Sequence, residues 1–110
     1  MALKVGVIGA AGKMGKMVCQ SIMAEDDLEL TAAFDPSNQG QDVGLIAGGR
    51  ENGVLIAKRI EDILDKQTVD VIVDFTIAKA AVVNIPKALK AGINVVVGTT
   101  GISDEEWAEF

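Results

Sequence analysis

The sequence predicts an α/β fold with a doubly wound, mostly parallel sheet and helices on both faces. Short apolar runs alternate with helical patterns along the chain, an order typical of parallel strands joined by crossover helices. Of the 110 residues 49% are hydrophobic but only 4% aromatic, with no Tyr. The core is therefore expected to be aliphatic, as in sheets buried on both faces. This length fits one small domain.

The first half of the chain gives two strands and one helix. Residues 4–8 are expected to form a strand that Gly9 ends, and residues 28–34 a second strand. Between them, an apolar pattern at steps of three and four predicts an amphipathic helix over residues 13–24. The apolar positions of that pattern are Met14, Met17, Val18 and Ile22.

The second half has weaker and stronger elements. Residues 38–53 are expected to be a loop with some irregular helix. A short strand at 54–57 and a short helix at 60–64 follow, then a strong strand at 69–73. Residues 78–91 predict a helix that Pro86 should kink or restart, because proline lacks the backbone donor. A last strand is expected at 93–97.

The end of the chain predicts one more helix. Ser103 and Glu106 have the spacing of a capping box, and acidic residues suit the first turn. The apolar residues Trp107, Ala108 and Phe110 would begin its buried face. No stop signal follows, so the chain is expected to continue as part of a longer protein.

A glycine-rich turn lies between the first strand and the first helix: Gly9, Ala10, Ala11, Gly12, Lys13, Met14 and Gly15. A dinucleotide's pyrophosphate would rest here on the helix N-terminus, as in Rossmann-type domains. Gly9 would permit the tight turn, Gly12 the approach of phosphate, and Gly15 close packing of helix on strand. The spacing G-x-x-G-x-x-G is a looser match than G-x-G-x-x-G.

Asp35 follows the second strand, where a ribose-binding acid is expected. Its alternative role is to start a turn with Pro36. A 2′-phosphate usually requires a basic residue beside the acid. Lys13 and Lys16 would supply that charge, or they are solvated surface residues; the sequence leaves both possibilities open.

Charge and composition exclude several classes of protein. Ten basic against sixteen acidic residues give a net charge of −6, which disfavours nucleic acid as a partner. No apolar run approaches the roughly 20 residues of a membrane span, and no leader peptide is recognised. A single cysteine and no histidine exclude an internal disulfide and a zinc site, and favour the reducing cytoplasm.

Other side chains are expected to be structural. Cys19 should be a buried small apolar group rather than a nucleophile, because no histidine is present to activate it. The methionines Met14, Met17 and Met23 are expected in the core. Asp70 and Asp74 flank a strand and are interpreted as edge or turn residues.

Three segments together, GVIGAAGKMGKMV, VDVIVDFT and INVVVGTTG, resemble the dihydrodipicolinate reductase family, over essentially all 110 residues. The resemblance implies that residues 9–14 hold the pyrophosphate of NADH and/or NADPH, and that Asp35 holds the adenosine ribose. It places Gly98, Thr99 and Thr100 beside the nicotinamide, with Phe75 and Thr76 near the same crevice. Some relatives carry Arg after the acid; Pro36 stands there in this chain, which argues against strong NADPH selectivity.

The resemblance also implies an activity for the full-length protein. Hydride transfer from the nicotinamide to a cyclic imine, 4-hydroxy-tetrahydrodipicolinate, would give tetrahydrodipicolinate in lysine and diaminopimelate biosynthesis. A histidine and a lysine of a second domain would act on the substrate, and that domain would form a homotetramer. This chain would supply cofactor binding only, with no catalytic residue and no activity of its own.

Two alternatives remain at this stage. One is the cofactor domain of another amino-acid-pathway dehydrogenase, against which the Gly98–Gly101 segment argues. The other is a non-enzymatic Rossmann module that binds CoA or senses nucleotides. Asp35 argues against CoA, because a ribose-binding acid suits a free hydroxyl rather than a phosphorylated ribose.

Overall fold

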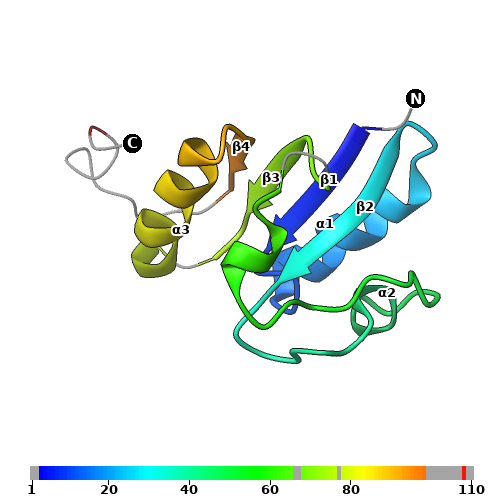
Figure 1. Ribbon diagram of the computed structural model, residues 1–110. Helices are drawn as coiled ribbons and strands as arrows, with labels where there is room; N and C mark the ends of the chain where they lie inside the picture. Colours follow the sequence, from blue (N-terminus) through cyan, green and yellow to red (C-terminus); the bar gives the residue numbers. More distant parts are fainter. Residues whose placement is uncertain (1–2, 66–67, 77, 99–107, 109–110) are drawn as a thin grey trace.

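The computed structural model describes residues 3–65, 68–76, 78–98 and 108. Four parallel strands form one sheet in the order β2-β1-β3-β4 (Figure 1). In chain order the elements are β1 (Leu3–Ile8), α1 (Lys13–Ala24), β2 (Leu28–Phe34), α2 (Val43–Ile46), the 3₁₀ helix η1 (Ile60–Ile63), β3 (Val71–Asp74), α3 (Ala78–Lys90) and β4 (Asn94–Val97). The expected helix that begins at Ser103 lies, except for Ala108, outside the described residues.

Two apolar cores cover the two faces of the sheet, which confirms the doubly wound fold. On one face Val5 and Val7 of β1 pack in the same cluster as Cys19 of α1. On the other face Ile8 and Ile72 share a cluster with residues of η1 and α3. The strand side chains alternate between the two clusters because successive residues of a strand point to opposite faces.

A bulge in β2 sets the register of its carboxyl end. Val5 pairs with Leu30, but the next residue of β1, Gly6, pairs with Ala32, so that Thr31 is the extra residue. The Thr31 hydroxyl donates to the carbonyl oxygen of Thr68 at 2.6 Å. Beyond the bulge Ile8 pairs with Phe34, and the residues that follow each strand, including Asp35, come to lie beside one another.

The expected strand at 54–57 is replaced by two isolated bridges. Leu55 pairs antiparallel with Asp42, whereas Ala57 pairs parallel with Phe34. The segment 38–53, predicted as a loop with some irregular helix, explains why no regular strand forms at 54–57. The Asp42 carboxylate accepts hydrogen bonds from the backbone N–H groups of four residues of this loop: Gly44, Leu45, Asn52 and Gly53. The loop is thus tied to its own Asp42 rather than to a long strand ladder.

Pro86 lies inside α3, and of its two predicted effects, a kink or a restart of the helix, the restart does not occur. The helix continues from Ala78 to Lys90. Proline removes one backbone donor, but Ala81, Ile85 and Ala88 are buried on both sides of it. Because tertiary packing supplies most of the stability of a protein helix, this buried stripe holds both halves against the sheet.

The inward face of α1 differs from the predicted one. Met14 and Met17 are 52% and 55% exposed, so their assignment to the core is wrong, whereas Met23 is partly buried against the core as expected. The buried face consists of Gly15, Cys19 and Ile22. Among the described residues no helix covers β3 and β4 on the α1 side. An open apolar groove of about 440 Å³ is left there, lined among others by Leu3, Val18, Val71, Val73 and Val96.

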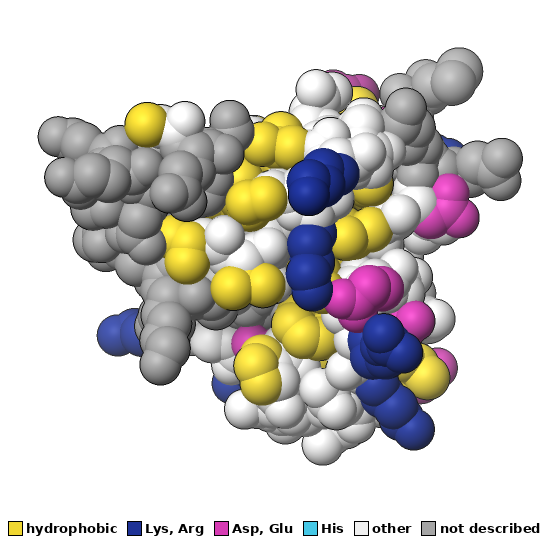
Figure 2. All heavy atoms as spheres, turned by 60° about the vertical axis from the view of Figure 1, so that its left-hand side comes forward, with side chains coloured by type: hydrophobic (Ala, Val, Ile, Leu, Met, Phe, Trp, Pro, Cys, Tyr) yellow, Lys and Arg dark blue, Asp and Glu magenta, His cyan; other side chains and the backbone are white. Residues whose placement is uncertain are grey.

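The opposite side of the molecule, with α3 toward the viewer, has a mixed surface. Figure 2 shows apolar side chains there interspersed with basic and acidic ones. Lys87 of α3 bonds to Glu61 of η1 at 2.8 Å, and Arg59 lies 3.4 Å from the same carboxylate. The Lys87 hydrogen bond is the main reason that the pKa of Glu61 falls to about 2. These side chains are well exposed, so the pair contributes little to stability.

Candidate functional site: the glycine loop and the carboxyl edge of the sheet

The loop from β1 to α1 is shaped by two glycines that the fold requires. Gly9 has a φ of +88°, a conformation that side chains rarely adopt. A Cβ on Gly15 would lie 1.9 Å from the carbonyl oxygen of Gly9, so α1 begins in direct contact with the loop. The N–H groups of Gly9 and Ala10 both donate to the carbonyl oxygen of Phe34, at 2.8 and 3.3 Å. The expected turn and close packing are both present.

Gly12, by contrast, has only weaker internal reasons to be glycine, because it is the N-cap of α1, where glycine is favoured over Ala and Val. Its φ of −75° and ψ of 167° are extended backbone open to any residue. A Cβ there would meet one atom, the backbone oxygen of Gly9, at 3.3 Å, a tight contact that a shift of a few tenths of an ångström would relieve. The first-turn N–H groups of Lys13, Met14 and Gly15 donate to no residue outside the helix in the described part of the chain. A helix N-terminus with unpaired donors and no side chain in front of it fits an anion such as a pyrophosphate.

Asp35 starts the turn that the sequence analysis gave as its alternative role, and it also contacts the glycine loop. It is only 9% exposed. One oxygen accepts the N–H of Ser37 at 2.8 Å and forms the turn, whereas the other accepts the N–H of Ala11 at 3.0 Å. The carboxylate thus ties the end of β2 to the glycine loop. Each oxygen keeps further acceptor capacity, and this is the chemistry that a ribose hydroxyl requires.

Asp74 begins a turn, which is one of the two roles expected for it, whereas the other expectation, a position at the edge of the sheet, is wrong. It is the last residue of β3, fully buried in the middle of the sheet, and not an edge residue. One carboxylate oxygen accepts from both the N–H and the hydroxyl of Thr76, at 2.9 and 2.6 Å. Asp70 is exposed and accepts from the Lys4 N–H at 2.8 Å, which agrees with its expected flanking position. The Asp-x-Thr spacing was the available signal for the buried turn.

The predicted residues that the structure describes lie at the carboxyl ends of neighbouring strands. The glycine loop follows β1, Asp35 follows β2, and Gly98 follows β4. The Gly98 N–H donates to the carbonyl oxygen of Asp74 at 2.9 Å, which joins the ends of β4 and β3. Thr99 and Thr100 lie outside the described residues. Open parallel sheets bind ligands at this edge.

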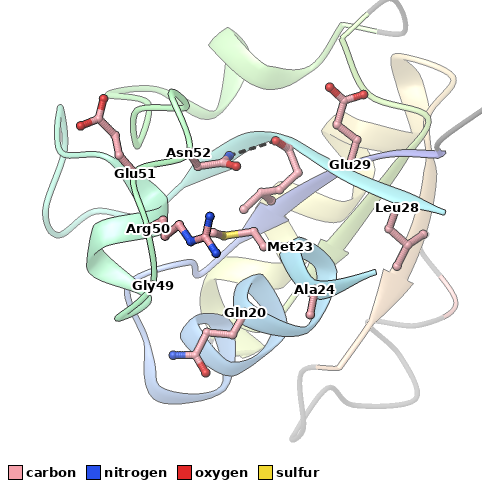
Figure 3. Close-up of a pocket in the computed structure, with 10 residues that line it drawn as sticks. Gln20, Met23, Ala24, Leu28, Glu29, Gly49, Arg50, Glu51 and Asn52 are labelled. Carbon is pink, nitrogen blue, oxygen red and sulfur yellow. Dashed lines mark hydrogen bonds between the residues drawn. The ribbon is translucent and has the colours of Figure 1, made fainter. Parts of the chain in front are cut away.

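A pocket of about 650 Å³ lies away from this edge, at the start of β2 (Figure 3). The second half of α1, the first residues of β2 and the segment 49–52 line it. Figure 3 shows the Asn52 amide bonded to the carbonyl oxygen of Leu30, at 3.2 Å. None of the predicted site residues lines this pocket, so its size does not make it the candidate site.

Three further expectations concern chemistry elsewhere in the chain. Cys19 is fully buried, and desolvation raises the pKa of its thiol to about 11, which confirms its assignment as a small apolar group. The described residues contain no cluster of acidic or sulfur side chains able to hold a metal ion. Within the same described part of the chain, no helix is long and apolar enough to cross a membrane.

A parallel sheet with a glycine loop opening its first helix, and an acid at the end of the second strand, defines a Rossmann-type nucleotide-binding domain. The structure superimposes on a dipicolinate-bound dihydrodipicolinate reductase from Paenisporosarcina sp. TG-14 with a TM-score of 0.78 and 25% identity, covering 99% of this chain and 42% of that one. The family model for the N-terminus of dihydrodipicolinate reductase matches residues 3–110, and the chain belongs to that family.

Relatives of known activity agree with this assignment. The chain is 48% identical to a 4-hydroxy-tetrahydrodipicolinate reductase of Methanobrevibacter smithii, over 97% of this chain and 41% of the relative. It is 40% identical to the reductase of the same name from Methanocaldococcus jannaschii, over 98% of this chain and again 41% of the relative. The chain therefore spans about two fifths of the length of the curated relatives it matches.

Proposed function

We propose that this chain forms the NADH- or NADPH-binding half of a 4-hydroxy-tetrahydrodipicolinate reductase. The observation that carries the proposal is Gly12. Its backbone conformation does not require a glycine, a Cβ would meet a single atom, at 3.3 Å, and it stands in front of first-turn amides that have no partner outside the helix among the described residues. A bound pyrophosphate explains both features. The oxidoreductase names of the relatives, which match nearly the whole chain, support the same function.

Each part of the edge has a proposed role. The backbone from Gly9 to Met14, with Ala10, Ala11, Gly12 and Lys13, would hold the pyrophosphate. Asp35, already fixed by two backbone N–H groups, would accept the hydroxyls of the adenosine ribose. The segment of Gly98, Thr99 and Thr100 would face the nicotinamide. The cofactor, when bound, supplies the hydride, and the chain's own residues position it and keep its phosphates paired.

The choice between NADH and NADPH depends on charge near the ribose. The Asp35 carboxylate favours a free 2′-hydroxyl over a phosphate. Lys13 is exposed on the first turn of α1, and Lys16 is half-buried one turn further along. We propose that the protein binds NADH well. We propose that it binds NADPH through Lys13 or Lys16, one of which would neutralise the 2′-phosphate.

Substrate chemistry is proposed to reside in further parts of a longer polypeptide. A second domain would provide the proton donor, the substrate anchor and a homotetramer interface, in a protein acting in the cytoplasm. The share of about 41% of each relative supports a longer protein. The open groove lined by Val71 and Val96 supports it too, because parallel strands are usually covered on both faces.

Cofactor binding is tested by calorimetry on the chain with NADH, NADPH and, as a control, CoA. We expect both nicotinamide cofactors to bind and CoA not to bind. A folded chain that binds neither cofactor at millimolar concentration would contradict the proposal. Tight CoA binding would instead favour the non-enzymatic alternative.

Activity is tested by following NAD(P)H absorbance with freshly prepared substrate. We expect none from the 110-residue chain, because hydride transfer also requires a held imine and a positioned proton donor. The longer protein should turn over at about 1 to 1000 per second. Turnover at such a rate by the short chain would show that the substrate site lies within it.

The proposal that a further domain covers this groove in the longer protein is tested with a cysteine reagent. Val96 is 56% exposed, and Cys19 is buried with a pKa near 11, so a Val96→Cys variant carries a single reactive thiol. A maleimide should label it in the 110-residue chain and label it slowly in the longer protein. Leu45→Cys, at an exposed position of α2, is the matched control and should react in both. Equal labelling of Val96→Cys in both proteins would refute the covered groove.

A further inference from the structure

The pocket at the start of β2 combines an apolar wall with a cationic side chain. Its volume of about 650 Å³ lies within the range of about 300–1000 Å³ that small-molecule sites occupy. Met23 of α1 and the β2 residues Leu28 and Leu30 line it, and all three belong to the apolar core on the α1 side of the sheet. Arg50 lines the same pocket from the segment 49–52.

The segment that carries Arg50 is fixed through its backbone. The Asp42 carboxylate accepts the N–H of Asn52 at 2.9 Å, and the Asn52 amide donates to the carbonyl oxygen of Leu30 at 3.2 Å. A Cβ on Gly44 would lie 2.1 Å from the carbonyl oxygen of Arg50, so the segment packs directly against α2. Arg50 therefore extends from a wall that is already formed without a ligand.

The charge of Arg50 is unpaired in this pocket. Sixteen acidic residues are present in the chain, yet none of those that the structure describes forms an ion pair with Arg50. The pocket has three charged lining residues, Arg50, Glu29 and Glu51. Figure 3 shows the Arg50 side chain extending toward Met23, whereas the carboxylates of Glu29 and Glu51 point away from the pocket. Arg50 is thus the charged lining residue that is directed into it.

We propose that this pocket binds a small organic carboxylate with an apolar chain. A guanidinium group matches a carboxylate with two parallel hydrogen bonds. The apolar chain of the ligand would lie on Met23 and Leu28. Asp35 follows the opposite end of β2, a strand of seven residues that spans about 20 Å. The site is therefore separate from the proposed cofactor site, and the inference does not depend on cofactor binding.

The first test compares three probes in an NMR titration of the isotope-labelled protein. Hexanoate has both the charge and the apolar chain, hexanamide has the chain without the charge, and inorganic phosphate has the charge without the chain. Hexanoate should shift the amide signals of Gly49 and Asn52 with a dissociation constant of about 1 mM, as expected for a ligand of its size. The two other probes should bind at this site at least about 10-fold more weakly, because each lacks one of the two contacts.

The second test changes the guanidinium. Arg50→Gln should weaken hexanoate at least about 10-fold and leave hexanamide unchanged, because the lost hydrogen bonds involve two charges. Arg50→Lys keeps the charge but loses the planar fork, so its loss should be smaller. Arg59→Gln, at an exposed position outside the pocket, is the matched control and should leave hexanoate binding unchanged. Arg50 is itself exposed, so the urea unfolding midpoint should stay the same in all three variants.

Three results would overturn the inference. In the first, hexanoate leaves the signals of Gly49 and Asn52 unmoved, or moves those of the glycine loop at Gly12 in their place. In the second, hexanamide binds as tightly as hexanoate, so that the charge has no part in recognition. In the third, Arg50→Gln and Arg59→Gln have equal effects, which would make Arg50 a solvated surface arginine only.

Discussion

Gly12→Val should weaken cofactor binding but leave the free energy of unfolding nearly unchanged. In the structure the new Cβ meets one atom, the Gly9 carbonyl oxygen at 3.3 Å, which must shift by a few tenths of an ångström, and φ is ordinary. The loss of a glycine at the helix N-cap costs up to about 1 kcal/mol, and the reduced freedom of the unfolded chain offsets about 0.4–1 kcal/mol of it. We therefore expect the free energy of unfolding to change by less than about 1 kcal/mol.

Cofactor affinity should respond much more strongly. The branched side chain would stand in front of the unpaired amides of Lys13 and Met14 and keep the phosphate away from them. One lost hydrogen bond to a charged group costs about 1.5–3 kcal/mol, which corresponds to a dissociation constant about 10- to 150-fold higher. Calorimetry with NADH measures this loss, and urea unfolding followed by circular dichroism measures stability.

Gly15→Ala is the matched control because it should show the opposite pattern. Its Cβ would lie 1.9 Å from a backbone oxygen, and atoms must shift by about 1 Å before the contact reaches the shortest distances found in proteins. Overpacking of this kind costs about 1–3 kcal/mol, so the unfolding midpoint should fall clearly. Normal NADH binding by Gly12→Val, or a stability loss as large as that of Gly15→Ala, would refute this interpretation of the loop.

Three further predictions use carboxylates. Asp35→Ala should weaken NADH more than NADPH, because a carboxylate favours a free 2′-hydroxyl; equal losses in calorimetry would remove Asp35 from the ribose site. Hydrogen bonds from backbone N–H groups, that of Asn52 first, hold the pKa of Asp42 below its usual value. Its contribution is thus present above about pH 4 and is lost as the pH falls through the lower folded pKa. Asp42→Asn should lower the urea unfolding midpoint at pH 7, and the difference in midpoint between the variant and the unchanged protein should become smaller as the pH is lowered. A difference in midpoint that does not depend on pH would contradict this. Lys87→Ala should raise the pKa of Glu61 from about 2 toward 4.5 in an NMR titration and barely move the unfolding midpoint; an unmoved Glu61 pKa would show that the pair does not persist in solution.

Local signals were enough to predict the elements that build the candidate site. The helix predicted at 13–24 and the strand predicted at 28–34 have the bounds of α1 and β2. Both are bordered by residues whose chemistry is local, a glycine loop before the helix and Asp35 with Pro36 after the strand. The strand predicted at 69–73 is observed at Val71–Asp74. Apolar patterning ended it one residue early, because a buried aspartate within a strand runs against the pattern.

Burial that depends on distant elements was predicted less well. Met14 and Met17 fit an amphipathic helix, yet they are exposed because α1 covers β1 and β2 and leaves β3 and β4 open in the described part of the chain. The register of β2 depends on a bulge at Thr31 that no pattern of two or 3.6 residues reveals. The Asp42 loop was missed for a similar reason, since two of its four N–H donors come from residues ten and eleven positions away.

The glycines of the carboxyl edge show why a motif alone under-determines a site. All of them look alike in the sequence, but the structure gives each a different cause. Gly9 is required by its positive φ, Gly15 by a backbone oxygen, and Gly98 by the ring of Phe75. Gly12 has the weakest internal causes, the preference for glycine at a helix N-cap and one contact of 3.3 Å. Because a substitution at Gly12 should disturb the fold least, Gly12 is a sharper test of the proposed cofactor binding than the motif as a whole.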